Sequence, residues 1–222
     1  MDFSLSEEQV AIQDLAKQIF QGGVTDESLR ATDKSDAAFD AARSKQLAEA
    51  NLLGIGIDEA HDGMGMGLLE LCLVLEEQGR SLAPVPLVPA IAQAGLAVQQ
   101  FGSDAQKSAL LPGLAAGDHW LASALQAGTQ PPEAPGTLAT RSGAGVLLNG
   151  AKSNVAVAEG ARAVLVSARR EDGTPGLFLL DPQAKGVRLE PRRTTHHKSV
   201  CALRLDDAPA RTERIGRLLG GG

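Results

Sequence analysis

Two adjacent histidines and two cysteines are the first side chains in this sequence that could do chemistry. His196 and His197 make a poor metal site without cysteine or carboxylate partners, because adjacent residues of a strand point to opposite faces. A solvated or structural role is therefore favoured for the pair, and no metal is expected. Cys72 lies in an apolar run, which favours a core position over a nucleophile, and Cys201 is far along the chain. Two buried free thiols are expected in preference to one disulfide.

A glycine-rich stretch at residues 58–67 contains His61, Asp62 and Gly63. Its glycines could cradle a phosphate, but no strand precedes them as one does in a nucleotide-binding βα turn. A turn is therefore favoured over catalysis. The sequence also has no Gly-x-Ser-x-Gly motif. Isolated motifs thus indicate no catalytic residue.

The stretch 145–169 is predicted to form strands around a tight turn at Asn149-Gly150. Residues 153–156 within it are small or polar, with no aromatic ring, and Lys152 is the ionisable group beside them. Such a segment offers little to a flat apolar ligand. Whether it binds one depends on the fold around it.

The composition is that of a globular protein with one large or two small domains. The chain has 222 residues, 43% hydrophobic and 22% charged, with a net charge of −6 that argues against a nucleic-acid partner. Aromatic residues make up only 3%, with no Tyr and one Trp, which is low for a protein that stacks flavin rings on its own side chains. No apolar run reaches ~18 residues and the start lacks signal-peptide features, so no membrane span and a cytoplasmic location are expected.

Helical signals dominate the first half of the sequence. Ser6 and Gln9 have the spacing of a capping box, as do Ser103 and Gln106. An apolar stripe follows the first pair at intervals of three and four residues. Further helices are predicted at about 38–53, 68–79, 89–101 and 103–116. The helix at 68–79 is so apolar that it is expected to be nearly buried, and Pro112 is expected to shorten the last one.

Strand signals follow Gly117, separated by turns that include residues 171–173 and by a proline-rich loop at 128–136. Strands are predicted at 119–125, 145–148, 162–168, 176–180, 186–190 and 200–205. The predicted fold class is α+β: an all-helical domain at residues 1–117, then an antiparallel β-sheet or barrel-like domain at 118–215. Residues 216–222 are predicted to be a loop.

Several stretches together resemble the acyl-CoA dehydrogenase family, over nearly the whole chain. MDFSLSEEQVAIQDLAKQIF is similar to the family's first helix, and ELCLVLEEQGRSLAPVP to its buried helix. A third stretch matches the pattern G-(T/S)-x-x-Q-K-x-x-x-L-P-x-L-x-x-G at Gly102, Gln106, Lys107, Leu111, Pro112, Leu114 and Gly117. The motif Leu-Asn-Gly-x-Lys then ends at Lys152. The combination is fairly specific.

The resemblance implies an FAD-dependent oxidoreductase of lipid metabolism that converts an acyl-CoA thioester to the 2,3-enoyl-CoA. A glutamate removes the α-proton and the flavin N5 takes the β-hydride. The family fold adds a C-terminal helical bundle, which carries that glutamate, and this chain is expected to end where the bundle begins. No catalytic residue is therefore assigned here.

Two motifs depart from the family pattern at the positions that contact the flavin. The family has Leu-Thr-Glu and a glycine-rich loop after the first strand, whereas here Gln126 replaces the Thr and the loop, with Thr129, Pro131 and Pro132, is proline-rich. After Leu-Asn-Gly-x-Lys the family has an aromatic residue, Ile and Thr. The residues that match the cofactor contacts are Leu125, Gln126, Asn154, Val155 and Ala156.

Losing these contacts weakens flavin binding. A lost stacking ring forfeits about 0.5–1.5 kcal/mol beyond area burial, and a lost hydroxyl donor costs roughly 1–3 kcal/mol. Together they correspond to ~10²-fold or more in affinity. Asn154 and Gln126 are polar and could make new bonds, so a re-tuned flavin site remains the alternative to a degenerate one.

Three hypotheses follow. The preferred one is a flavin-poor subunit of a heteromeric acyl-CoA dehydrogenase, with FAD bound weakly or shared with a partner subunit. The second is a fragment of an ordinary FAD-dependent enzyme. The third is a non-catalytic protein that binds acyl-CoA or another protein. Acyl-CoA and a homo- or hetero-oligomeric partner are the expected partners.

Overall fold

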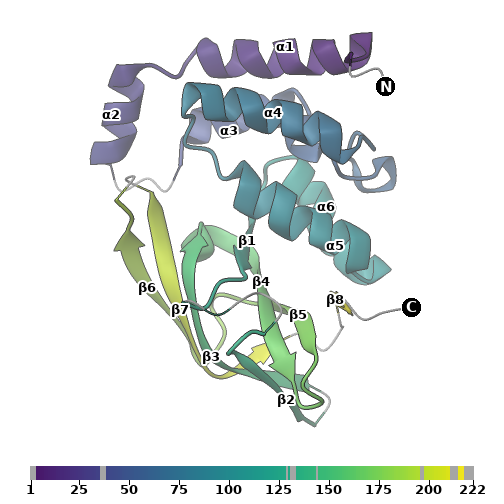
Figure 1. Ribbon diagram of the computed structural model, residues 1–222, viewed down its shortest axis with the longest axis vertical. Coiled ribbons are helices and arrows are strands. Elements are labelled where there is room, and N and C mark those ends of the chain that lie inside the picture. The colour runs from purple at the N-terminus through teal and green to yellow at the C-terminus, as the bar shows by residue number, and fades with distance from the viewer. Residues whose placement is uncertain are drawn as a thin grey trace.

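Helices fill the first half of the chain and strands the second in the computed structural model (Figure 1). The structure describes residues 4–35, 39–128, 130, 134–143, 145–195 and 198–210, and the backbone of 215–217. The helices are α1 (Glu7–Gln21), α2 (Asp26–Lys34), α3 (Ala41–Glu49), α4 (Leu68–Ser81), a π-helical segment (Val88–Gly95) that continues into α5 (Leu96–Phe101), and α6 (Asp104–Ala115). The strands are β1 (Trp120–Ala124), β2 (Leu138–Ser142), β3 (Gly145–Ala156), β4 (Ala161–Arg170), β5 (Pro175–Leu180), β6 (Val187–Arg193), β7 (Ser199–Ala210) and β8 (Ile215–Arg217).

The predicted capping boxes begin their helices as expected. At α1, Ser6 Oγ accepts from the Gln9 N–H at 3.2 Å and Gln9 Oε1 accepts from the Ser6 N–H at 3.0 Å. Ser103 and Gln106 repeat the arrangement at α6. This first helix then packs along α4, and Gln9 Nε2 donates to Glu70 Oε1 at 2.8 Å.

Two helical predictions were wrong in extent, and one helix was missed. The helix expected at 38–53 is shorter, because Asp40 caps α3 and Asn51 adopts a left-handed φ of 58° after it. Helix α2 was not predicted at all. Helix α6 runs through Pro112, which therefore does not shorten it.

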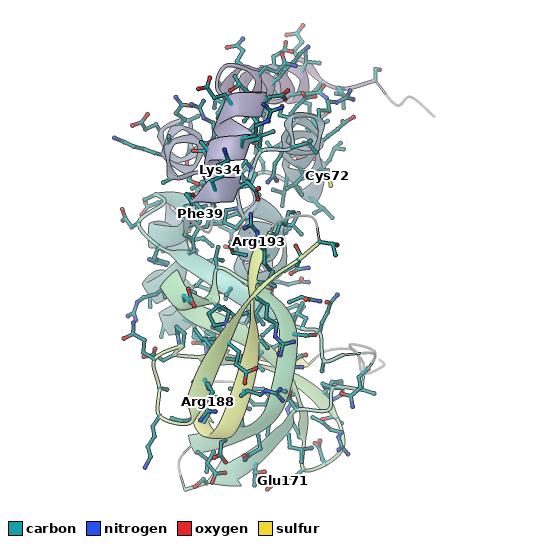
Figure 2. All side chains as sticks on the ribbon, turned by 90° about the vertical axis from the view of Figure 1, so that its left-hand side faces the viewer. Lys34, Phe39, Cys72, Glu171, Arg188 and Arg193 are labelled. Atoms are coloured by element: carbon teal, nitrogen blue, oxygen red, sulfur yellow. The ribbon has the colours of Figure 1, made fainter. Side chains whose placement is uncertain are left out.

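Helix α4 is less buried than its composition suggests. Leu71 and Val74 are buried, but Leu68 and Leu69 are 64% and 52% exposed. Cys72 lies on the same open side and is exposed, so its predicted core position was wrong; Figure 2 shows it at the surface of the helical end. Cys201 is buried, and both thiols are free. Helix α4 is apolar on more than one side, and the elements packed against it cover only part of that apolar surface.

The strands form one sheet in the order β1-β4-β2-β3-β7-β5-β8, with β6 on the edge against β7. Pairing of β4 with β5, and of β5 with β7, curves the sheet into a barrel-like shape. The predicted α+β class, helices followed by a barrel-like sheet, is confirmed. Most neighbours are antiparallel, but β1 and β2 both run parallel to β4, which the sequence did not indicate.

The Asn149-Gly150 pair is not a turn. It lies inside the long strand β3, and the end of β2 pairs instead with the start of β3 through Ser142 and Gly145. Asn149 bonds across the sheet to Asp207, donating from Nδ2 to Oδ1 and accepting from the Asp207 N–H, both at 2.9 Å. Gly150 has φ +139°, and a Cβ there would lie 2.9 Å from Thr137 Cα. The pair therefore lies at a β-bulge, where the register of β3 and β7 shifts, and Gly150 allows the backbone of Thr137 to approach closely.

Two apolar cores alternate across the sheet. One joins the helices to the near face of β1, β4 and β5, including Trp120 and Leu165; the other fills the barrel, including Val155 and Val166. Phe39 meets Trp120 edge-on, with ring centroids 5.4 Å apart. A second contact joins the helices to the sheet: Arg193 of β6, which lies beneath α2 in Figure 2, donates to the carbonyl of Asp33 in that helix at 2.6 Å.

The boundary expected at residue 117 falls between α6 and β1. No described helix has the length and apolar character needed to cross a membrane. The His196-His197 pair lies outside the described residues, as do Thr129, Pro131 and Pro132 of the proline-rich loop.

Candidate functional site

The segment after β1 lies against the second half of β3, and together they form what we call the candidate wall, residues 125–128 and 153–156. The Ser153 N–H donates to the Gln126 carbonyl at 3.0 Å, and the Gly128 N–H donates to Ser153 Oγ at 3.3 Å. These bonds bring together the two motifs that matched the cofactor contacts. All eight wall residues are described, and none is aromatic.

A β-bulge shapes the wall. The pairing of β3 with β7 shifts register between Lys152 and Val155, so that Ser153 and Asn154 have no partner residue on β7. Asn154 adopts φ +56°, a left-handed conformation that asparagine tolerates better than residues with bulky side chains. The bulge leaves the Asn154 side chain exposed, and its Nδ2 donates to Gln126 Oε1 at 3.3 Å.

The five sequence-predicted positions are not equivalent in the structure. Gln126 and Asn154 are exposed and meet each other, whereas Leu125 is half-buried against the helical core. Val155 is fully buried in the barrel core opposite Cys201, so its side chain does not line the surface that the two amides share. Ala156 is half-buried opposite Val200.

A buried ammonium group lies beneath the wall. Lys152 is 2% exposed, and its Nζ donates to Ser167 Oγ at 2.8 Å. Ser167 is also buried, and its hydroxyl donates to the Leu125 carbonyl at 3.2 Å. Burial lowers the pKa of Lys152 from 10.5 to about 8. The sequence signal was an ionisable residue in a stretch of small and apolar ones, but its partner Ser167 could not be found from spacing.

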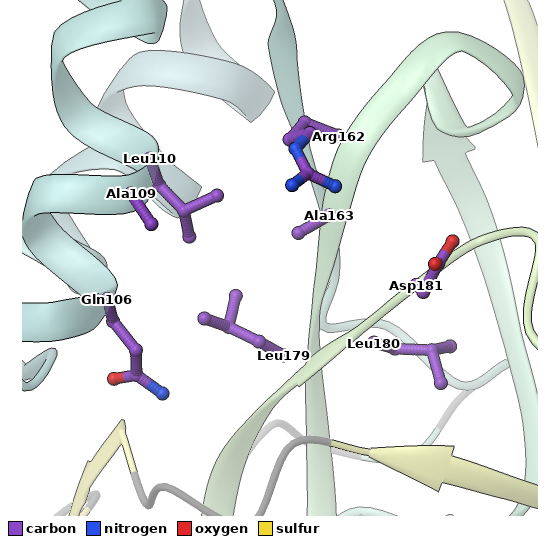
Figure 3. Close-up of a pocket in the computed structure, with 8 residues that line it drawn as sticks. All are labelled: Gln106, Ala109, Leu110, Arg162, Ala163, Leu179, Leu180 and Asp181. Atoms are coloured by element: carbon purple, nitrogen blue, oxygen red, sulfur yellow. The ribbon is translucent and has the colours of Figure 1, made fainter.

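A separate hollow lies between α6 and the sheet (Figure 3). It is lined by Gln106, Ala109, Leu110, Arg162, Ala163, Leu179, Leu180 and Asp181. Its volume of about 20 Å³ is enough for one water molecule and far too small for a flavin ring. None of its lining residues belongs to the candidate wall. Among the described residues, no group of three or more His, Cys, Asp or Glu side chains is placed to hold a metal.

The side chains of the candidate wall do not fit a flavin ring. No aromatic ring is available for stacking, and the one hydroxyl, of Ser153, already accepts from Gly128. The two amides that replace the expected contacts are bonded to each other. The left-handed backbone at Asn154 also disfavours an aromatic side chain at that position.

The comparisons with known proteins agree with this picture of the fold. The family described as "Acyl-CoA dehydrogenase, N-terminal domain" matches residues 6–118. Among curated proteins, Acyl-CoA dehydrogenase FadE27 of Mycobacterium tuberculosis is 31% identical over 210 residues, covering 94% of this chain and 55% of the relative. Benzylmalonyl-CoA dehydrogenase of Aromatoleum aromaticum is 31% identical over 214 residues, covering 91% and 54%. The chain thus spans about half the length of these relatives.

Solved structures show the same similarity. A variant of the Tcur3481-Tcur3483 steroid ACAD is 42% identical with a TM-score of 0.90, covering 96% of this chain and 58% of that one. The ChsE4-ChsE5 complex from Mycobacterium tuberculosis is 29% identical with a TM-score of 0.90, covering 98% and 59%. Both names join two different proteins in one assembly.

Proposed function

This chain belongs to the acyl-CoA dehydrogenase family, and from that premise we propose that it is the flavin-poor subunit of a heteromeric enzyme that introduces a 2,3 double bond into a CoA thioester. The match of the family's N-terminal domain to residues 6–118 confirms the resemblance seen in the sequence. The division of labour between subunits is the proposal. Under it, FAD binds this chain weakly or is held mainly by a partner subunit.

One observation carries the proposal: the side chains of Asn154 and Gln126, at two positions that the family resemblance matches to cofactor contacts, are bonded to each other. A ring edge placed there would have to break this bond, which is worth about 0.5–1.5 kcal/mol net. It would gain no stacked aromatic ring in return. Under the proposal, cofactor binding therefore falls mainly to the partner.

The similar structures support a heteromer and suggest a substrate class. The Tcur3481-Tcur3483 protein is called a steroid ACAD, and the ChsE4-ChsE5 protein is called a complex. We therefore take a second family member of unlike sequence as the partner and a steroid-derived CoA thioester as the first substrate to test. The cytoplasmic location expected from the sequence stays a prediction.

The test is reconstitution. Three samples are purified: this chain alone, a family member encoded beside it alone, and the two proteins together. We expect a CoA thioester to bleach the flavin absorbance of the pair and to leave this chain alone unchanged. Flavin reduction by this chain without a partner would support an ordinary flavoenzyme. CoA binding by the pair with no flavin reduction by any thioester would support a non-catalytic binding protein.

A further inference from the structure

Lys152 and Ser167 have the spacing of a serine–lysine nucleophile and base, at 2.8 Å, but they do not have the access that catalysis requires. Both side chains are buried, at 2% and 1% exposure, and neither lines the hollow beside α6. No substrate atom can reach the serine oxygen. The pair must therefore act within the protein.

The bonds of the pair lead directly to the candidate wall. Ser167 Oγ accepts from the ammonium and donates to the Leu125 carbonyl, at the end of β1. The next carbonyl, of Gln126, accepts from the Ser153 N–H, and Ser153 is the residue that follows Lys152. Two consecutive carbonyls of one segment are thus held by groups on or beside β3 and β4.

The surroundings of Lys152 make its charge costly for the fold. In the sheet it is aligned with Leu203 of β7, which is aligned in turn with Leu189 of β6. No described carboxylate pairs with it, and an apolar residue of similar length would avoid burying a charge. A buried polar group of this kind favours one arrangement over others when its bonds are directional.

We propose that Lys152, acting through Ser167, is a positioning residue that fixes the end of β1 against the β3 bulge and so sets Gln126 opposite Asn154. The inference rests on the proposed function only in treating the candidate wall as the surface that faces the cofactor. The ammonium orders the serine hydroxyl, because a group that only donates leaves that hydroxyl to donate onward to Leu125. Without it the hydroxyl is free to rotate.

The test reads the wall itself in the full chain by NMR, with no flavin present. We expect Lys152→Met and Ser167→Ala each to move the side-chain amide signals of Gln126 and Asn154, and to speed hydrogen exchange at the Ser153 N–H by roughly tenfold. The double variant should match the single ones, because the two residues act in one chain of bonds. Ser167→Ala keeps the test available if Lys152→Met does not fold.

Thr137→Val is the matched control. Thr137 is equally buried, directly before β2, and its hydroxyl donates to the Ala151 carbonyl of β3 at 3.4 Å rather than to the Leu125 carbonyl. It should leave the amide signals of Gln126 and Asn154 in place. Unchanged signals in Lys152→Met, or exchange that accelerates equally at Ser153 and at Leu165 in the core, would overturn the inference. Either outcome is independent of whether the chain binds flavin.

Discussion

Asn154 Nδ2 donates to Gln126 Oε1 at 3.3 Å, joining two segments that are 28 residues apart in the sequence. Each of these residues replaces a cofactor contact that the family resemblance implies. Their pairing means that the two replacements are complementary to each other. A pair of this kind gives the wall a bonded form that does not require a ring, which is the observation behind the proposal that FAD binds this chain weakly.

Restoring hydroxyl groups to the wall should increase flavin affinity. Gln126→Thr combined with Ala156→Thr removes the amide pair and supplies two hydroxyls, each contributing about 0.5–1.5 kcal/mol net if it bonds a ring edge. We expect FAD affinity to rise on the order of tenfold, measured by quenching of flavin fluorescence. Gln183→Thr, at an exposed glutamine far from the wall in sequence, is the control and should have no effect. Equal affinity in the double variant and the parent would argue against the assignment of the wall.

An aromatic side chain at position 154 should destabilise the fold. Asn154 has φ +56°, and Asn154→Trp places a bulky residue in a left-handed conformation that costs about 1–2 kcal/mol. Asn154→Gly removes the side chain without that strain and serves as the comparison. Urea unfolding should show a lower midpoint for the tryptophan variant alone. A tryptophan variant as stable as the parent would mean that the bulge rearranges freely.

The stability of the chain should depend on pH through Lys152. Because its pKa is about 8 in the folded chain and near 10.5 when unfolded, the unfolded chain binds more protons between these values. Unfolding free energy contributed by this group should therefore rise as pH increases from about 8 to 10.5, by at most on the order of 3 kcal/mol.

Lys152→Met should remove this rise, which urea unfolding at a series of pH values can measure. Burial raises the pKa of Cys201, which acts in the opposite direction at alkaline pH. Since Cys201 is present in both proteins, the difference between parent and variant isolates Lys152. The same pH slope in both would show that the amine is not the group responsible.

Gly150→Ala should be strongly destabilising. A Cβ at this position would lie 2.9 Å from Thr137 Cα, and φ is +139°. We expect a loss of more than about 1 kcal/mol in unfolding free energy. Gly160→Ala is the control, because nothing lies within 4 Å of a Cβ there. Thermal melting of the two variants measures the difference, and equal melting temperatures would contradict the predicted loss of stability in Gly150→Ala.

Local sequence signals located most helices of the first half, though not α2, because caps and apolar spacing act within a few residues. The Ser6 and Ser103 capping boxes illustrate this. The same signals failed at Asn149-Gly150, where a turn motif serves a bulge whose partner, Asp207, is 58 residues away. They also failed for Cys72, since the exposure of one side of an apolar helix depends on which elements pack against it.

The candidate wall could be located from the sequence only through the resemblance to a family. Periodicity gave no reason to connect residue 126 with residue 154, because β1 joins the sheet by parallel pairing with β4. The link between Lys152 and Ser167 likewise depends on strand order. Contacts between distant strands are therefore the part of the site that required the structure.

The FAD content of the isolated chain decides whether this chain holds the cofactor without a partner. The protein is incubated with excess FAD, desalted, and its flavin and protein absorbances are compared. We expect a nearly colourless protein with far less than one flavin per chain, because the wall amides of Asn154 and Gln126 bond to each other. A yellow protein that retains close to one FAD per chain without any partner would contradict it.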